Sequence, residues 1–520
     1  MIGVDRLRVI TAARVAALLL AVLAAAIPLA GTAAAQEPEP SSSARTAWGF
    51  DRSDLAPHPA VRFGVLPNGM RYALMRNAVP AGAMSVRLHL AGGAMLEGER
   101  EQGFMHLIEH MIFHGSANIP EGALPLMLAQ RGLRRWTDFD AYTSHDETVY
   151  RLDLAQADAG ARETALTLMR EIAGNLAFTR RGVAGAKRRV REEIAARDAV
   201  QDRIATAQNA FFLPGTRLAR GPVAGTSASV RRASAAALRR IYALHYVPSR
   251  ATLVLVGDFD PTAAEAEIVA RLSGWRVAPT PHTPPQPVST DRRQGIRTRL
   301  FVDPAAPTMV TIATVAPLAA TEDAAGRRDW HFLEHLAVEM LNRRLARLAA
   351  GPDPPFARAG AAAYDHFSTA RIARIEAEAA DRNWRRALSH TAFELRRALE
   401  DGFSPAELAE QLAASRRGLA RDAAPRTSSA LADAIVETAG RSIVFTATAG
   451  PAASEAYLAR VRLADVNAAF SRAWAAPGRL IFLSHNRRIP NADAEIAAGW
   501  ARAVAARVAA PEESEPAGTP

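Results

Sequence analysis

The sequence predicts an α+β fold of two duplicated domains of about 225 residues, each a mostly antiparallel sheet covered by helices. Three observations support this prediction. Short strand-like segments alternate with longer helical patterns throughout the chain. The strand pattern of residues 84–90 returns at residues 309–315, an offset of 225 residues. At the same offset Phe178 falls on Phe403 and one His/Glu motif falls on another. A repeat of this length indicates two copies of one unit.

The first 35 residues predict a secretory signal peptide. Arg6, Arg8 and Arg14 precede an apolar run over residues 15–30, and an Ala-rich cleavage site ends before Gln36. An uncleaved membrane anchor is the alternative, although the run is shorter than the roughly 20 residues that a spanning helix needs. No other stretch is apolar enough to span a membrane. We therefore expect an exported, periplasmic protein with no stable membrane span after cleavage.

Composition limits the classes of partner and site. The 520 residues contain 49% hydrophobic and 22% charged residues, which is ordinary for a globular protein. The formal charge is +10, but the basic residues form no dense tract of the kind that binds nucleic acid, and we expect no nucleic-acid partner. Some preference for acidic peptides or an anionic membrane surface remains open. Because the chain has no cysteine, any metal site must use His and carboxylate ligands.

Sequence patterns divide the chain into six segments. They are a signal peptide (1–35), a Pro/Ser/Glu-rich flexible leader (36–57), a first domain (58–277), a Pro-rich linker (278–292), a second homologous domain (293–510) and a disordered tail (511–520). The first domain should contain the functional site and the second should be non-catalytic, for the reasons given below.

Within the first domain the expected elements follow in order. Residues 61–76 predict a hairpin around Pro67-Asn68-Gly69, and residues 84–90 predict a half-buried strand with His89 on its polar face. Further strands are expected over residues 136–154 and 251–256, and helices over 103–116, 122–131, 159–176, 183–207, 234–245 and 263–272. In the second domain the repeat predicts strands over residues 309–315 and 480–483.

The predicted helix over residues 103–116 contains His106, Glu109 and His110 in the order H-x-x-E-H. On a helix the i,i+4 spacing places both imidazoles on one face with the carboxylate beside them. Two neutral imidazoles leave room for one protein oxygen ligand and a water, as in a catalytic zinc site, and the motif is the inverted zincin signature. Polar positions on an ordinary amphipathic helix are the alternative, so the motif needs support from its context.

A third ligand is expected from Glu192 or Glu193 on the predicted helix over residues 183–207. The repeat provides an internal control, because these glutamates fall on Arg417 and Gly418 in the second copy. The second motif, His331, Glu334 and His335, therefore lacks a third ligand and is interpreted as a vestige.

Several blocks in this order resemble the pitrilysin/insulinase family of inverted zincin metallopeptidases, in particular the N-terminal half of its long periplasmic bacterial members. The resemblance covers residues 59–483, with GFMHLIEHMIFHGS, DAYTSHDETVY, RRVREEI, GTRLARGPVAGT and HYVPSRATLVLVGDFDP as its most specific parts. It implies one Zn²⁺ per chain, bound by His106, His110 and Glu193, with Glu109 as the catalytic base. The family pattern places the ligand three residues after a helix valine, here Val190, which selects Glu193; Glu192 remains a minority candidate.

Two positions depart from the family pattern. The supporting glutamate seven residues before the ligand is replaced by Ala186, which weakens the expected support of the site. The family's Asn-Ala on the strand that pairs with substrate resembles Asp140-Ala141 here. The resemblance implies that this strand adds the substrate as a further β-strand. The substrate-binding residues implied are Asp140, Ala141, Tyr142, Thr143 and Ser144.

Long members of the family contain four such domains, and this sequence contains two. The resemblance therefore implies a homodimer or a separately encoded second subunit that completes the chamber around a peptide substrate. The expected activity is zinc-dependent hydrolysis of peptides or unfolded segments by a zinc-activated water with Glu109 as base. The alternative is a non-catalytic scaffold subunit of a two-subunit peptidase of the same family.

Overall fold

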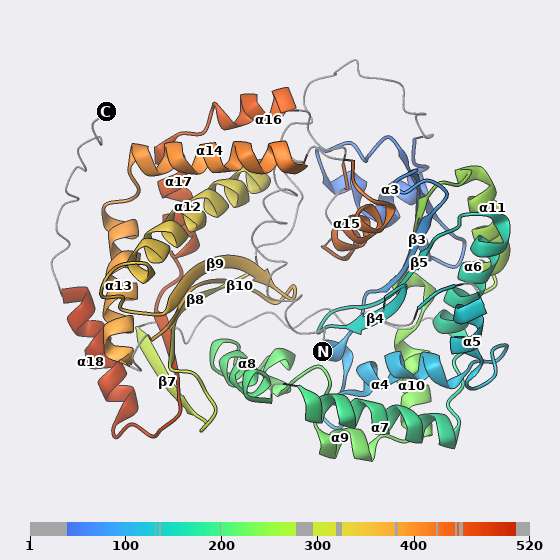
Figure 1. Ribbon diagram of the computed structural model, residues 1–520, viewed down its shortest axis with the longest axis horizontal. Helices are drawn as coiled ribbons and strands as arrows, with labels where there is room; N and C mark the ends of the chain where they lie inside the picture. Colours follow the sequence, from blue (N-terminus) through green and yellow to red (C-terminus); the bar gives the residue numbers. More distant parts are fainter. Residues whose placement is uncertain are drawn as a thin grey trace.

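The computed structural model describes residues 39–130, 132–134, 137–197, 199–276, 295–318, 325–379, 383–422, 425–441, 445–446 and 451–505. The predicted signal peptide, the linker and the tail lie outside these residues. Figure 1 shows two α+β units side by side, each with one sheet and a set of covering helices. The predicted fold class is confirmed.

The first domain contains a six-stranded sheet in the order β1-β2-β6-β3-β5-β4, in which only β2 and β6 pair in parallel. Its strands are β1 Val61–Val65, β2 Arg71–Arg76, β3 Met84–Leu90, β4 Phe139–Thr143, β5 Thr148–Leu154 and β6 Ala251–Gly257. Its helices are α4 Phe104–Met111, α5 Ala123–Gln130, α6 Ala159–Gly174, α7 Arg180–Ala196, α8 Ala199–Phe212, α9 Ser227–Arg232, α10 Ala235–His245 and α11 Pro261–Leu272. The single helix expected over residues 183–207 is therefore two helices, α7 and α8.

The second domain repeats this plan with a five-stranded sheet in the order β7-β11-β8-β10-β9. Its strands are β7 Ile296–Val302, β8 Met309–Pro317, β9 Arg358–His366, β10 Ala370–Glu378 and β11 Arg479–His485. Its helices are α12 Ala325–Ala349, α13 Trp384–Glu400, α14 Pro405–Asp422, α15 Ser428–Arg441, α16 Pro451–Leu458, α17 Leu463–Ala473 and α18 Ala492–Ala505. The order, with β7 and β11 as its parallel pair, matches the first sheet without β1 and confirms the duplication.

The segment expected to be a flexible leader is folded from Ser42 onward. Helix α3 Ser42–Trp48 and a 3-10 turn at Phe50–Arg52 bury Trp48 and Phe50. Both rings lie about 5 Å from the ring of Phe63 on β1, and Trp48 Nε1 donates to Gly64 O at 3.0 Å. The prediction of a flexible leader is wrong for residues 42–52, because two aromatic side chains in a polar segment bury enough apolar surface to order it.

Each domain packs one of its helices on the sheet of the other domain. Helix α8 of the first domain packs Ile204 and Phe212 against the second sheet, where Phe482 on β11 belongs to the same apolar cluster. Helix α15 of the second domain packs Ile435 and Val436 against β3 and β6 of the first sheet. Each domain therefore covers one face of its partner's sheet, and the two cores depend on each other.

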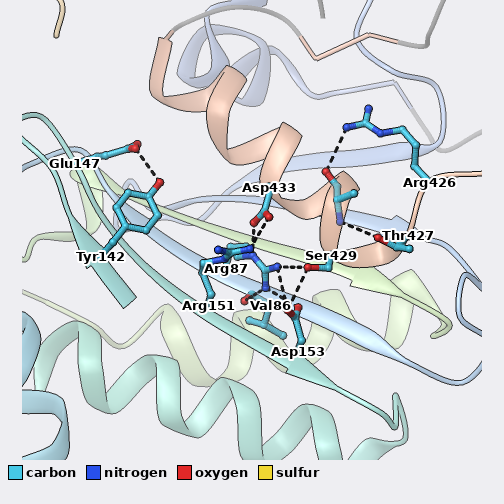
Figure 2. Close-up of polar contacts among 11 residues, drawn as sticks. Val86, Arg87, Tyr142, Glu147, Arg151, Asp153, Arg426, Thr427, Ser429 and Asp433 are labelled. Atoms are coloured by element: carbon cyan, nitrogen blue, oxygen red, sulfur yellow. Dashed lines mark hydrogen bonds and ion pairs between the residues drawn. The ribbon is translucent and has the colours of Figure 1, made fainter. Parts of the chain in front are cut away.

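Helix α15 also corrects the prediction that β3 is half-buried. Ser85, Arg87 and His89, the polar face of the strand, are each no more than 3% exposed. Figure 2 shows how Arg87 is compensated: Nε donates to Asp433 of α15 at 2.7 Å, and Nη1 donates to Asp153 of β5 at 2.8 Å. A periodicity argument could not detect a covering helix that comes from about 350 residues further along the chain.

We expect Ile435→Ala in the second domain to destabilise the first sheet. The side chain is 0% exposed, and removing a buried isoleucine costs about 2–5 kcal/mol. Hydrogen exchange measured by mass spectrometry should become faster at the amides of β3 and β6. The matched control is Ile496→Ala, which is equally buried but lies in the second domain's own core. If the amides of β6 exchanged at the same rate in the two variants, the packing of α15 on the first sheet would not stabilise that sheet.

Candidate metal centre

Helix α4 carries the H-x-x-E-H motif in a fully buried position. All eight of its residues are buried, including His106, Glu109 and His110 at 6–8% exposure. The helix begins after Gly103, whose φ of +86° and close approach to Ala224 O leave no room for a Cβ atom. The buried Glu97 carboxylate accepts from the amides of Gly103 and Met105 at 2.9 and 2.7 Å, so it caps the first turn. The start of the motif helix is therefore fixed on two sides.

Helix α7 packs on α4 and brings Glu193 to the two imidazoles. Glu193 Oε2 lies 3.5 Å from His106 Nε2 and 3.2 Å from His110 Nε2. A tetrahedral zinc site with bonds of about 2.0–2.2 Å places its ligand atoms roughly 3.3–3.5 Å apart. The two distances from Glu193 to the imidazoles therefore fit a zinc ion.

The protonation of these groups also suits a metal. Burial lowers the pKa of His106 to about 3, so its imidazole is neutral and can act as a ligand. Burial alone would raise the pKa of Glu193, but the hydrogen bond with His110 and the electrostatic interaction with the polar His106 ring outweigh it. Together with the charge of Arg197, they lower this pKa to about 2, so the carboxylate is ionised.

Glu109 lies beside the two imidazoles, and its carboxylate forms a group with them in which the nearest ligand atoms are all within 4.8 Å. Its Oε2 accepts a hydrogen bond of 2.7 Å from the hydroxyl of Thr143 at the end of β4. Burial raises the pKa of Glu109 to about 7, although His110 and the Thr143 hydrogen bond act in the opposite direction. A carboxylate with a pKa near neutrality can both accept and return a proton.

Glu192, the alternative ligand, points away from the cluster. Its side chain is 55% exposed and forms ion pairs of 3.8 and 3.6 Å with Arg188 and Arg189. Two adjacent helix residues cannot face the same neighbour, because each step turns the side chain by about 100°. Of the two candidates, the structure brings only Glu193 to the imidazoles.

Arg197 is a residue of this site that the sequence reasoning missed. Its guanidinium donates to Oε1 of Glu193 and thereby leaves Oε2 facing the imidazoles. Ala186, where the resemblance implies a supporting glutamate, is fully buried and offers no polar group. The i,i+4 spacing of Glu193 and Arg197, the residue that caps the end of α7, could have indicated this contact.

Strand β4 contains four of the five residues expected to bind substrate, and it is an edge strand. Within the described residues β5 is its only strand partner. The bonds Ser144 N to Glu147 O and Asp153 N to Asp138 O mark the hydrogen-bonded pairs of this ladder. By alternation, Asp140 and Tyr142 also bond to β5, so Ala141 and Thr143 direct their main-chain groups to the open edge.

The five residues therefore differ in what they can offer a substrate. Thr143 directs its hydroxyl to Glu109, whereas Tyr142 lies on the other face of the strand and donates to Glu147 at 2.9 Å (Figure 2). Ser144 lies beyond the end of β4, and its amide is already bonded to Glu147 O. Ser144 is therefore unsuited to donate its amide to a substrate.

In the second domain two of the three corresponding groups are paired with arginines. Arg371 donates to Glu334, and Arg327 Nε donates to His331 Nε2 at 3.3 Å. Gly418, the counterpart of Glu193, supplies no side chain. Among the residues that the structure describes, no comparable group of metal-binding side chains lies in the second domain.

A two-domain α+β fold with an H-x-x-E-H helix facing a glutamate from a second helix defines the metallopeptidase class of inverted zincins. Comparison with known proteins identifies the family. The family profile described as "Insulinase (Peptidase family M16)" matches residues 72–212, and the one described as "Peptidase M16 inactive domain" matches residues 232–415. The chain belongs to peptidase family M16.

Two relatives are each named "Probable zinc protease PqqL". The protein from Haemophilus influenzae is 30% identical over 203 residues, which is 39% of this chain and 22% of the relative. The Escherichia coli protein is 32% identical over 211 residues, which is 40% of this chain and 23% of the relative. The alignments thus span less than a quarter of each relative.

The fold is similar to the crystal structure of the first half of the periplasmic protease PqqL from Escherichia coli. The TM-score is 0.76 at 22% identity, covering 88% of this chain and 99% of that structure. The structure of the whole E. coli protease is matched over 89% of this chain and 52% of its own length, so this chain spans about half of it.

We expect Glu193→Gln to lower zinc affinity by about 100-fold, and Glu192→Gln to leave it unchanged. The loss of an anionic ligand and of its charge accounts for the first result, and the outward position of Glu192 accounts for the second. Zinc dissociation constants from competition with a chromogenic chelator provide the measurement. Equal losses in both variants would show that neither glutamate has a specific role.

Arg197→Met should weaken zinc binding about 10-fold, in line with the 10–100-fold effect of partners that orient metal ligands. Without the guanidinium, the Glu193 carboxylate can rotate away from the imidazoles. Arg188→Met is the matched control, since Arg188 lies on the helix that carries Glu193 and pairs with Glu192. Unchanged zinc affinity in Arg197→Met would show that Glu193 is oriented without it.

Proposed function

We propose that the chain is a zinc-dependent endopeptidase that hydrolyses peptides or unfolded segments. The observation that supports this most directly is the convergence of Glu193 Oε2 on both imidazole Nε2 atoms, at 3.5 and 3.2 Å, beside the buried carboxylate of Glu109. His106, His110 and Glu193 would hold one Zn²⁺. The ion would supply Lewis acidity, which activates a water molecule and polarises the scissile carbonyl.

Glu109 would act as the general base and then as the general acid. Its carboxylate takes a proton from the attacking water and returns it to the leaving amine. The hydrogen bond from Thr143 occupies Oε2 and leaves Oε1 for the water. Burial raises the pKa of this carboxyl above its ordinary value, which favours uptake of the proton from the water. The same residue can therefore serve both proton transfers.

The open edge of β4 would hold the substrate main chain. Ala141 and Thr143 direct their amide and carbonyl groups to this edge, so an extended peptide can pair with them as a further strand. Main-chain pairing does not depend on the peptide's sequence, and it requires that the peptide be extended. Unfolded segments therefore suit this edge better than folded proteins. Because Thr143 also contacts Glu109, the pairing brings the peptide to the base.

The chamber would be completed by a second copy of this chain or by a separately encoded subunit. The chain matches one half of the E. coli periplasmic protease, which contains further polypeptide in its other half. We also propose that the protein is exported to the periplasm. None of the helices in the described part of the chain combines the length and apolar character needed to cross a membrane.

We expect Glu109→Gln to reduce peptide hydrolysis by about 100-fold or more, because general acid–base catalysis contributes roughly 10²–10⁴-fold. The measurement is cleavage of a quenched fluorescent peptide library, with zinc content determined for both proteins. The variant should retain one zinc per chain, since Glu109 is not a ligand in this proposal.

Other outcomes separate the alternatives. Zinc-loaded wild-type protein that cleaves no peptide, alone or with its candidate second subunits, would favour a non-catalytic scaffold. Activity that appears only on addition of such a subunit would retain the mechanism and require the partner. Purified protein that binds no zinc would contradict both the ligand set and the mechanism.

A further inference from the structure

The net charge of the chain is concentrated in one stretch. Residues 180–240 contain fourteen Arg and Lys residues and four Asp and Glu residues, a net charge of +10. The whole chain also carries +10, so the other 459 residues are neutral in sum. The basic residues are therefore not distributed evenly along the chain, and the net positive charge lies in one segment.

The fold gathers much of this charge on the outer surface of three helices. Nine exposed arginines form what we call the basic face: Arg180, Arg181, Arg188, Arg189 and Arg191 on α7, Arg231 and Arg232 on α9, and Arg239 and Arg240 on α10. Figure 1 shows α7, α9 and α10 together at the lower edge of the molecule. Lys187 on α7 joins the helices by donating to Arg231 O and Ala233 O at 2.6 and 2.9 Å.

Acidic neighbours neutralise only part of the basic face. Glu192 is shared by two of its arginines, Glu121 lies 3.8 Å from Arg181, and Glu101 pairs with Arg240 at 2.5 Å. The remaining five arginines have no acidic partner among the described residues: Arg180, Arg191, Arg231, Arg232 and Arg239. The face therefore keeps most of its positive charge.

The geometry indicates an extended anionic partner. From Arg180 to Arg191 the helix rises about 16 Å, so the guanidinium groups are spread over a wide area and do not converge on one point. Leu244 adds an apolar contact, because it is 43% exposed and lies one helical turn from Arg240. Guanidinium groups bind phosphate with two parallel hydrogen bonds, and an exposed leucine among them suits the boundary between headgroups and acyl chains.

We propose that the basic face docks the protein on a lipid bilayer with anionic phospholipid headgroups. The contact is peripheral and electrostatic, with arginines on phosphates and Leu244 at the headgroup boundary. It does not depend on peptidase activity, because none of the nine arginines belongs to the metal cluster. Since α7 carries Glu193 on its other side, docking would also hold the cluster at a fixed distance from the bilayer.

The test is sedimentation of the full chain with vesicles of phosphatidylcholine alone or mixed with an equal share of phosphatidylglycerol. Wild-type protein should bind the anionic vesicles, and binding should fall between 0.1 and 1 M salt as the screening length drops from about 10 to about 3 Å. A face variant carries Arg180→Gln, Arg188→Gln, Arg191→Gln, Arg231→Gln and Arg232→Gln. Its partitioning to anionic vesicles should be about 3000-fold weaker, since each of the five arginines near such a surface contributes roughly a fivefold effect.

A control variant removes the same charge elsewhere, through Arg76→Gln, Arg100→Gln, Arg460→Gln, Arg487→Gln and Arg488→Gln, all exposed and outside the basic face. It should bind as the wild type does. The apolar run over residues 15–30 is common to all three proteins, so binding to phosphatidylcholine should be equal in all of them. Circular dichroism should show the same helix content in each.

Three outcomes would overturn the proposal. The first is an equal loss of binding in the control and face variants, which would show an effect of net charge alone. The second is equal binding of the wild type to both kinds of vesicle. The third is binding of the wild type to soluble polyglutamate through the basic face but not to anionic vesicles, which would assign the face to an acidic polypeptide.

Discussion

The burial of α4 is the constraint on which the site depends. Three ionisable side chains lie on a helix of eight buried residues, where a charged group without a partner is costly. Particular neighbours contact these groups: Glu193 faces both imidazoles, and Thr143 donates to Glu109. The neighbours come from α7 and β4, so the packing of these elements on α4 sets the geometry of the cluster. Arg197 then fixes the direction of the Glu193 carboxylate.

The packing of α8 on the second sheet and of α15 on the first sheet links this site to the second domain. Helix α7 ends at Ala196, three residues after Glu193, and α8 begins at Ala199 and packs on the other sheet. A shift of one domain relative to the other must therefore be absorbed in the short connection between these helices or be transmitted to Glu193. On the opposite face of the first sheet, Arg87 and Arg151 both bind Asp433 of α15 (Figure 2). The second domain thus supports β3 and β5, which in turn hold the edge strand β4.

Helix α7 has the proposed metal ligand on one side and exposed arginines on the other. One side presents Glu193 to the imidazoles, and the other presents exposed arginines to solvent. Ala186 and Val190 lie buried between them and pack the helix on the first-domain core. The stretch over residues 180–240, to which α7 belongs, carries a net charge of +10, which equals the net charge of the whole chain.

The sequence by itself determined the fold class, the duplication and the helix that carries His106, Glu109 and His110, because these follow from local periodicity and from spacing within one helix. It also limited the third ligand to two adjacent glutamates. Tertiary structure decided what depends on contacts between distant segments: the orientation of Glu193, the Thr143 hydrogen bond, the packing of Trp48 and Phe50, and the burial of the polar face of β3. In each case the partner lies on another element, and no pattern within a single segment records which face that partner covers.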